Sequence, residues 1–229
     1  PYPDGPVDHE VPVLQVRDVE GKLLAMLFGY ACHNTTLSID QYNGDYAGFA
    51  QIAFEQAHPG TTAMFMMGCG GDINPEPRGR PELAQQHGTS LAASVNHALK
   101  GPLHPVRGPL TTRLERIDLL YMVPPTESEL ESRQDDGDIY DQRLTKRLLK
   151  ILRSGKSLPT SHPYPVQVMQ FSNDLSLVAL GGETVVDYAL RLERELTGNH
   201  IWIAGYSNEV FAYIPSERVL TEGGYEGGG

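Results

Sequence analysis

Features that define several large classes of protein are scarce in this sequence or absent from it. Its 229 residues include only two cysteines, Cys32 and Cys69, which are too few for a disulfide scaffold. No apolar run approaches the roughly 20 residues that a membrane-spanning helix needs. The net charge is −11 and no basic cluster is present, which argues against nucleic acid as a partner. What remains is a chain with 40% apolar residues, long enough to bury one sizeable core.

Both ends of the sequence have the character of internal positions. The chain begins at Pro1 rather than at a methionine, and it ends in a glycine-rich run around Tyr225. We therefore expect it to be a piece of a longer protein. The lack of a signal peptide after Pro1 then leaves export undecided.

One stretch, residues 28–50, combines a strand end, a polar loop and the start of a helix. The apolar run at residues 23–31 predicts a buried strand that ends just before His33. A polar loop then leads to Gly-Asp at residues 44–45 and to a helix predicted over residues 45–57. Ligands of open α/β sheets bind just beyond the C-terminal ends of strands, so His33 has the position of a site residue.

Three further predicted strands also end in polar residues. They are residues 62–67, followed by Asp72 and Asn74; residues 175–180, followed by Glu183; and residues 201–204, followed by Asn208 and Tyr213. The glycines in the loop of residues 68–75 permit unusual backbone angles or the close approach of another group. The loop therefore fits two interpretations, the wall of a pocket and a tight turn. We expect these strand ends to converge on His33.

The alternation of predicted strands and helices indicates an α/β fold. We expect a mixed-sheet sandwich with flanking helices and with ligands at the C-terminal ends of the strands. Other helices are predicted over residues 81–99 and after Thr184, which has capping-box spacing to Asp187. The charged segment 124–155 is expected to form a helical insertion or outer layer, and residues 1–229 a single domain.

A histidine, a carboxylate and a phenol at strand ends have the chemistry of a zinc site that leaves a position open for water. His33, Glu183 and Tyr213 are far apart in the sequence, so their spacing alone does not establish such a site. Each also has a structural interpretation. His33 fits a hydrogen-bonded pocket histidine, Glu183 a charge at a helix N-terminus, and Tyr213 a packing residue.

The order of these motifs resembles that of the neutral/alkaline non-lysosomal ceramidases. The motifs are Ala-Cys-His-Asn-Thr at 31–35, Gly-Asp-Tyr-Ala-Gly at 44–48, Gly-Asp-Ile-Asn-Pro at 71–75, Gly-Glu-Thr at 182–184, Gly-Tyr-Ser-Asn at 205–208, Tyr213, and Tyr-Glu-Gly at 225–227. The resemblance extends from His33 to the C-terminus and looks closest to shorter bacterial ceramidase-like proteins. It implies that the chain is most of a larger ceramidase-like catalytic domain, truncated at both ends.

That family hydrolyses the amide bond of N-acyl-sphingosine with one zinc ion, so the resemblance implies a zinc-dependent amide hydrolase. Carried over to this chain, His33, Glu183 and Tyr213 would be zinc ligands. Tyr225 would lie at the substrate carbonyl, and with Asn74 it would stabilise the oxyanion. Asp45 would orient His33 from outside the ligand shell, because metal-bound histidines usually donate their other N–H to a carboxylate or carbonyl.

The sequence departs from the family pattern at two points. The family has a further ligand histidine in an upstream His-rich segment that this sequence lacks, and His9 lies in a different context. We therefore expect that ligand to lie upstream of Pro1. The family also has a serine at the position of Asn74, once proposed as a nucleophile. Asn74 cannot be acylated in that way, so zinc-bound water is the expected nucleophile.

Two alternatives to a lipid amide hydrolase stay open at this stage. The chain could be a catalytically inactive ceramidase-like domain with a binding or structural role, or it could hydrolyse a soluble, non-lipid amide. By resemblance the protein would be secreted or periplasmic. The sequence predicts neither the oligomeric state nor the state of Cys32 and Cys69, for which two buried thiols are the simplest interpretation.

Overall fold

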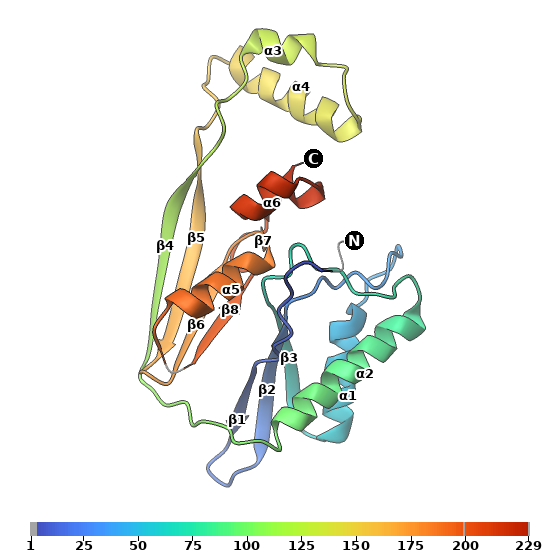
Figure 1. Cartoon of the computed structure of the whole chain (residues 1–229), viewed down its shortest axis with the longest axis vertical. Helices are drawn as coiled ribbons and strands as arrows, with labels where there is room; N and C mark the ends of the chain where they lie inside the picture. The colour runs from blue at the N-terminus through green and yellow to red at the C-terminus, as the bar shows by residue number, and fades with distance from the viewer. Residues whose placement is uncertain (1–3, 199, 229) are drawn as a thin grey trace. The chain divides into compact units, whose positions relative to one another are not determined.

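The computed structural model describes residues 4–198 and 200–228. It divides into two compact units, of which unit 1 comprises Pro1–Leu114 and Val166–Gly229 and unit 2 comprises Glu115–Pro165. The elements in chain order (Figure 1) are β1 (Val13–Arg17), β2 (Leu23–Tyr30), α1 (Asp45–Ala57), β3 (Thr62–Met67), α2 (Pro81–Ala98), β4 (Leu110–Leu120), α3 (Glu127–Ser132), α4 (Ile139–Arg153), β5 (Ser161–Phe171), β6 (Leu175–Leu180), β7 (Glu183–Thr184), α5 (Val186–Glu195), β8 (Ile201–Ala204), β9 (Tyr213–Ile214), α6 (Glu217–Glu222) and the 3₁₀ turn η1 (Tyr225–Gly227).

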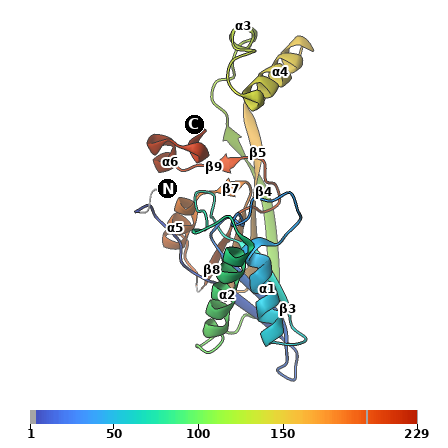
Figure 2. The ribbon, with the colours of Figure 1, turned by 90° about the vertical axis from the view of Figure 1, so that its right-hand side faces the viewer.

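The first sheet of unit 1 has the order β1-β2-β3, with β1 antiparallel and β3 parallel to β2. A parallel pair needs a crossover, and α1 supplies it. Figure 2 shows α1 and α2 together beside β3. Helices and sheet share one core, made of Met26, Phe28, Cys32, Tyr46, Ala47, Ala50, Phe54, Ala63, Leu91, Ala92 and Val95.

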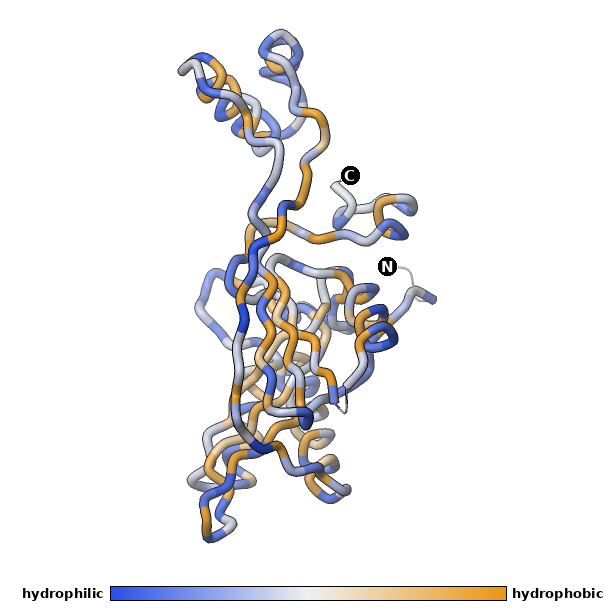
Figure 3. The backbone as a smooth tube through the Cα atoms, turned by 90° about the vertical axis from the view of Figure 1, so that its left-hand side faces the viewer, coloured by the Kyte–Doolittle hydropathy of each residue, from blue (hydrophilic) through white to orange (hydrophobic). Residues whose placement is uncertain are grey.

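The second sheet has the order β4-β5-β6-β8, with β5 antiparallel and β8 parallel to β6. Its buried residues pack against partly buried side chains from all three strands of the first sheet, and α5 packs beside β8. The members of this inter-sheet core are Leu175, Leu177, Ala179 and Trp202, with Leu14, Leu27 and Met66 against them. Figure 3 shows hydrophobic residues concentrated along these strands. The predicted α/β sandwich of mixed sheets is confirmed.

A third, two-stranded sheet joins β7 and β9 in parallel, with Glu183 opposite Tyr213 and Thr184 opposite Ile214. The sequence analysis did not predict this sheet. It also placed a capping box at the start of α5, which is wrong. The N-cap is Val185 without a side-chain cap, because the Thr184 backbone is committed to β7 and the Asp187 carboxylate binds elsewhere.

Unit 2 contains the two helices expected in the charged segment. Each begins with a capping box, Thr126 with Glu129 in α3 and Asp138 with Asp141 in α4. The interpretation of residues 1–229 as a single domain stays a prediction. Within the described part of the chain, no helix combines the length and apolar character that crossing a membrane requires.

Candidate functional site

The glycine-rich loop after β3 packs backbone to backbone against two other strand ends. A Cβ atom at Gly70 would lie 2.6 Å from the Cys32 nitrogen, and one at Gly71 would lie 2.5 Å from the Glu183 carbonyl oxygen. The Gly71 N–H donates to Thr184 O at 2.9 Å. The glycines are therefore needed for close approach rather than for a turn alone. Their packing brings the segment after β2 next to β7.

His33 and Glu183 meet at this junction. The His33 Nε2 atom lies 2.9 Å from Glu183 Oε2, and the two side chains are 12% and 25% exposed. On the other side of the ring, Nδ1 lies 3.1 Å from the Ile73 carbonyl oxygen, which can only accept a hydrogen bond. The Nδ1 atom therefore carries the proton donated to Ile73, and Nε2 is the ring nitrogen that faces Glu183.

Two tyrosines complete the surroundings of Glu183. The Tyr206 hydroxyl lies 2.8 Å from His33 Nε2 and 3.3 Å from Glu183 Oε2. The Tyr213 ring lies 6.2 Å from the His33 ring. Burial, together with the charge of Glu183 and a hydrogen bond to it, raises the pKa of Tyr213 to about 12 and raises that of Tyr206 as well. Beside this carboxylate both phenols favour the protonated form, which donates hydrogen bonds.

Of the three catalytic candidates, Tyr225 lies against Tyr213 of this group. Its ring is edge-on to that of Tyr213, with centroids 5.4 Å apart, and the residue is 75% exposed. Asn74 is also exposed, but its Oδ1 atom accepts from Thr35 Oγ1 at 3.1 Å and from Arg78 Nη1 at 3.3 Å. Asn74 lines a cavity of about 500 Å³ whose walls combine apolar residues with the charged side chains of Asp72, Glu76, Arg78, Arg218, Glu222 and Glu226.

Asp45 does not orient His33 as expected, because its carboxylate binds backbone N–H groups instead. The donors are Thr36 at 3.2 Å, Leu37 at 2.8 Å and Tyr46 at 2.7 Å. The Ile73 carbonyl takes the expected place beside His33 Nδ1. Asp45 thus stabilises the turn between the His33 loop and α1, and its contribution to the site is to fix that loop.

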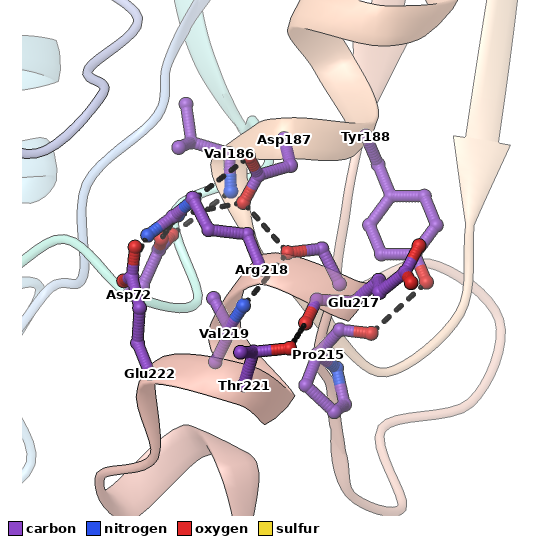
Figure 4. A network of polar contacts seen from close by, with 11 residues as sticks. Asp72, Val186, Asp187, Tyr188, Pro215, Glu217, Arg218, Val219, Thr221 and Glu222 are labelled. Carbon is purple, nitrogen blue, oxygen red and sulfur yellow. Dashed lines mark hydrogen bonds and ion pairs between the residues drawn. The ribbon is translucent and has the colours of Figure 1, made fainter.

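A cluster of charges connects the other segments around the site (Figure 4). Arg218 binds both oxygens of Asp187, at 3.0 Å from Nε and 2.6 Å from Nη2. It also reaches Asp72 at 3.3 Å and Glu222 at 2.7 Å. The second oxygen of Asp72 accepts from Val186 N at 2.8 Å. One guanidinium therefore joins the loop after β3, the start of α5 and α6.

Tyr206 is the site residue that sequence reasoning missed. It lies in the Gly-Tyr-Ser-Asn motif directly after β8, so the rule that selected other strand ends applied to it too. From this region the sequence pattern predicted Asn208 and Tyr213 instead. The Asn208 side chain donates to Gln167 Oε1 at 3.2 Å. No local pattern indicates that Tyr206 adopts a positive φ, here 53°.

The donor chemistry at this junction suits a zinc ion. Imidazole and carboxylate are usual zinc ligands, and a histidine whose Nδ1–H is held by a carbonyl has the orientation typical of metal sites. Within the described ranges, no three His, Cys, Asp or Glu side chains are grouped to hold a metal ion. Among the described residues, further ligands for a metal bound by His33 and Glu183 would therefore be phenol oxygens.

No protein-family model and no curated protein sequence matches the chain. Two similar solved structures are neutral ceramidase from Pseudomonas aeruginosa, with 17% identity and a TM-score of 0.70, and a ceramidase complexed with C2, with 17% identity and a TM-score of 0.73. The alignments cover 97% of this chain but only 43% and 44% of those chains. The chain therefore spans less than half the length of these ceramidases, and over that part it has the fold of neutral ceramidase.

Proposed function

We propose that this chain is part of a zinc-dependent amide hydrolase related to neutral ceramidase. The observation that carries the proposal is the contact between His33 Nε2 and Glu183 Oε2, two residues separated by 150 positions in the sequence. Tyr213 pairs with Glu183 across the third sheet, so the third ligand implied by the resemblance lies next to the other two. The similarity of fold to two ceramidase structures supports the same conclusion.

His33, Glu183 and Tyr213 would hold the zinc ion, which when bound lowers the pKa of a water ligand toward about 7 and polarises the amide carbonyl. The Ile73 carbonyl fixes the imidazole in the tautomer that presents Nε2 to the site. Tyr225, exposed and edge-on to Tyr213, donates a hydrogen bond to the carbonyl oxygen of the substrate as negative charge develops there.

A soluble amide is a second candidate substrate, and one feature favours it. The cavity beside Ile73 has walls that carry both carboxylates and guanidinium groups, among them Asp72, Arg78 and Arg218. Such walls suit a polar acyl or amine group better than a long alkyl chain, because apolar atoms do not compensate the desolvation of charged groups.

Zinc content provides the first test of the hydrolase proposal. We expect the protein to carry stoichiometric zinc by elemental analysis and to lose it in His33→Ala and Glu183→Gln. His87→Ala is the matched control, since this histidine binds only the Pro77 carbonyl among the contacts described for it and should leave the zinc content unchanged.

Substrate assays then separate the two candidate activities. The zinc-loaded protein would be incubated with an N-acyl-sphingosine and with a water-soluble N-acyl amide, and release of the free amine would be measured. Hydrolysis of either substrate that is lost in Glu183→Gln supports the proposal and identifies the substrate class. Absence of zinc from folded wild-type protein would refute it and leave a ceramidase-like scaffold with a binding or structural role.

A further inference from the structure

From the geometry around His33 we infer that the Tyr206 hydroxyl is an additional metal-binding donor of this site. The inference rests on the proposed function, because it concerns the same metal centre, but it adds a ligand that the motif resemblance does not include. It would give the centre four donors from this chain, two of them phenols, so a bound water would make the zinc at least five-coordinate.

Three polar atoms face one another at the centre of the site. They are His33 Nε2, Glu183 Oε2 and Tyr206 Oη. The His33 atom lies 2.9 Å from that of Glu183 and 2.8 Å from that of Tyr206, and the last two are 3.3 Å apart. Ligand atoms bound at about 2.0–2.2 Å to one tetrahedral zinc ion lie roughly 3.3–3.6 Å apart. The observed triangle needs to widen by only about half an ångström on two edges to match this spacing.

All three atoms of this triangle can accept, and so each can serve as a ligand to one cation. The Ile73 carbonyl lies beside His33 Nδ1, so Nε2 is the ring nitrogen left to face Glu183 and Tyr206. The Tyr206 hydroxyl has one proton, which it can direct fully to only one of the other two atoms. A metal ion at the centre of the triangle would bind all three atoms at once.

The backbone of Tyr206 is also held in a conformation that its side chain disfavours. Its φ of 53° lies in the left-handed region, which is uncommon for a bulky aromatic residue. Neighbouring backbone bonds enforce this conformation, from Tyr206 N to Gly182 O at 3.0 Å and from Ser207 N to Leu180 O at 2.9 Å. Glycine would fit here without strain, so the phenol itself accounts for a tyrosine at this position.

The ring of Tyr206 is oriented for this contact. It stands edge-on to the His33 ring, at an interplanar angle of 87° and a centroid distance of 5.7 Å. Its hydroxyl end therefore approaches Nε2 rather than the face of the imidazole. Tyr188 provides a contrast, because its hydroxyl donates to the Pro215 carbonyl, as Figure 4 shows.

The test compares metal binding by Tyr206→Phe, Tyr213→Phe and the control Tyr188→Phe. Zinc affinity would be measured by competition with a chromophoric chelator, and the coordination shell by the visible spectrum of bound cobalt(II). We expect Tyr206→Phe to lose more affinity than the roughly 10- to 100-fold that removal of an outer-shell partner costs. Its cobalt spectrum should change as that of Tyr213→Phe does, while Tyr188→Phe keeps the wild-type affinity and spectrum.

A second variant covers the case in which Tyr206→Phe does not fold. Tyr206→Gly removes the phenol and relieves the positive φ, so it should fold and show the same loss of affinity. Wild-type affinity in either variant, or a loss below 100-fold with an unchanged cobalt spectrum, overturns the inference and leaves the proposed function standing. A folded wild-type protein that binds neither metal overturns both.

Discussion

Replacing Arg218 with methionine would remove the cation shared by three carboxylates while keeping most of the length of the side chain. A hydrogen bond to a charged group contributes roughly 1.5–3 kcal/mol. Solvent screening reduces that figure here, because the Arg218 side chain is 32% exposed. The two hydrogen bonds to Asp187 and the contact with the less exposed Asp72 contribute most of the stabilisation by Arg218. We therefore expect the variant to lose about 2 kcal/mol in the free energy of unfolding. For a chain of this length this lowers the Tm by roughly 4–8 °C.

The same variant has a defined pH dependence. Burial alone would raise the pKa of Asp187, but hydrogen bonds from Arg218 and Ser216 lower it overall. A carboxylate with a lowered folded-state pKa stabilises the protein above its unfolded pKa, about 3.9, and loses this effect as pH falls through the folded value. Burial raises the pKa of Asp72, and the Arg218 charge offsets part of that cost only while Asp72 is ionised. The Tm difference should therefore shrink below about pH 4.

Thermal unfolding followed by circular dichroism at about pH 7 and about pH 3 measures both effects. Arg191→Met is the matched control, because its partner Glu195 lies one turn away on the same helix and the two side chains are 64% and 55% exposed. We expect that control to change the Tm little. Equal Tm values for Arg218→Met and wild type at neutral pH, or a difference that persists unchanged in acid, would refute the reasoning.

Three further predictions concern the packing of unit 1. Gly71→Ala places a Cβ 2.5 Å from the Glu183 carbonyl oxygen. We expect it to lower the free energy of unfolding, measured by chemical denaturation, by about 1–3 kcal/mol and to weaken zinc binding. A variant as stable as the wild type would contradict this. Gly48→Ala in α1 has no heavy atom within 4 Å of the new Cβ and should instead stabilise by about 0.5–1 kcal/mol in the same assay. Burial raises the pKa of Cys32 and Cys69 to about 12, so iodoacetamide should modify neither thiol until denaturant is added, as mass spectrometry would report.

The parts of the fold that local sequence patterns determine agree with the prediction. The helix predicted over residues 45–57 is α1, because a Gly-Asp start, an apolar face and a Pro-Gly end all lie within one short stretch. The two predicted thiols are both free and buried. Hydrophobic runs likewise predicted β2, β3, β6 and β8 of the two main sheets.

The candidate site was only partly predictable, for reasons that lie in its long-range contacts. β7 and β9 have two residues each, too few to show a strand period, and only their pairing places Glu183 opposite Tyr213. The ligand set came from the resemblance of motifs and not from spacing. Asp187 looked like part of a helix cap because its partner Arg218 is 31 positions away. Tyr206 gave no signal, since its orientation depends on backbone bonds to distant segments.

The separation of His33 and Glu183 in the sequence has a consequence for how the site forms during folding. The first sheet and its helices are built from contacts within the first hundred residues, whereas the site requires a contact across 150 positions. Loop closure over such a distance is slow compared with helix and hairpin formation. The junction of His33, Glu183 and Tyr206 should therefore be among the last parts to become native. A probe that reports on this junction would measure completed folding of the whole unit, not the appearance of its first sheet.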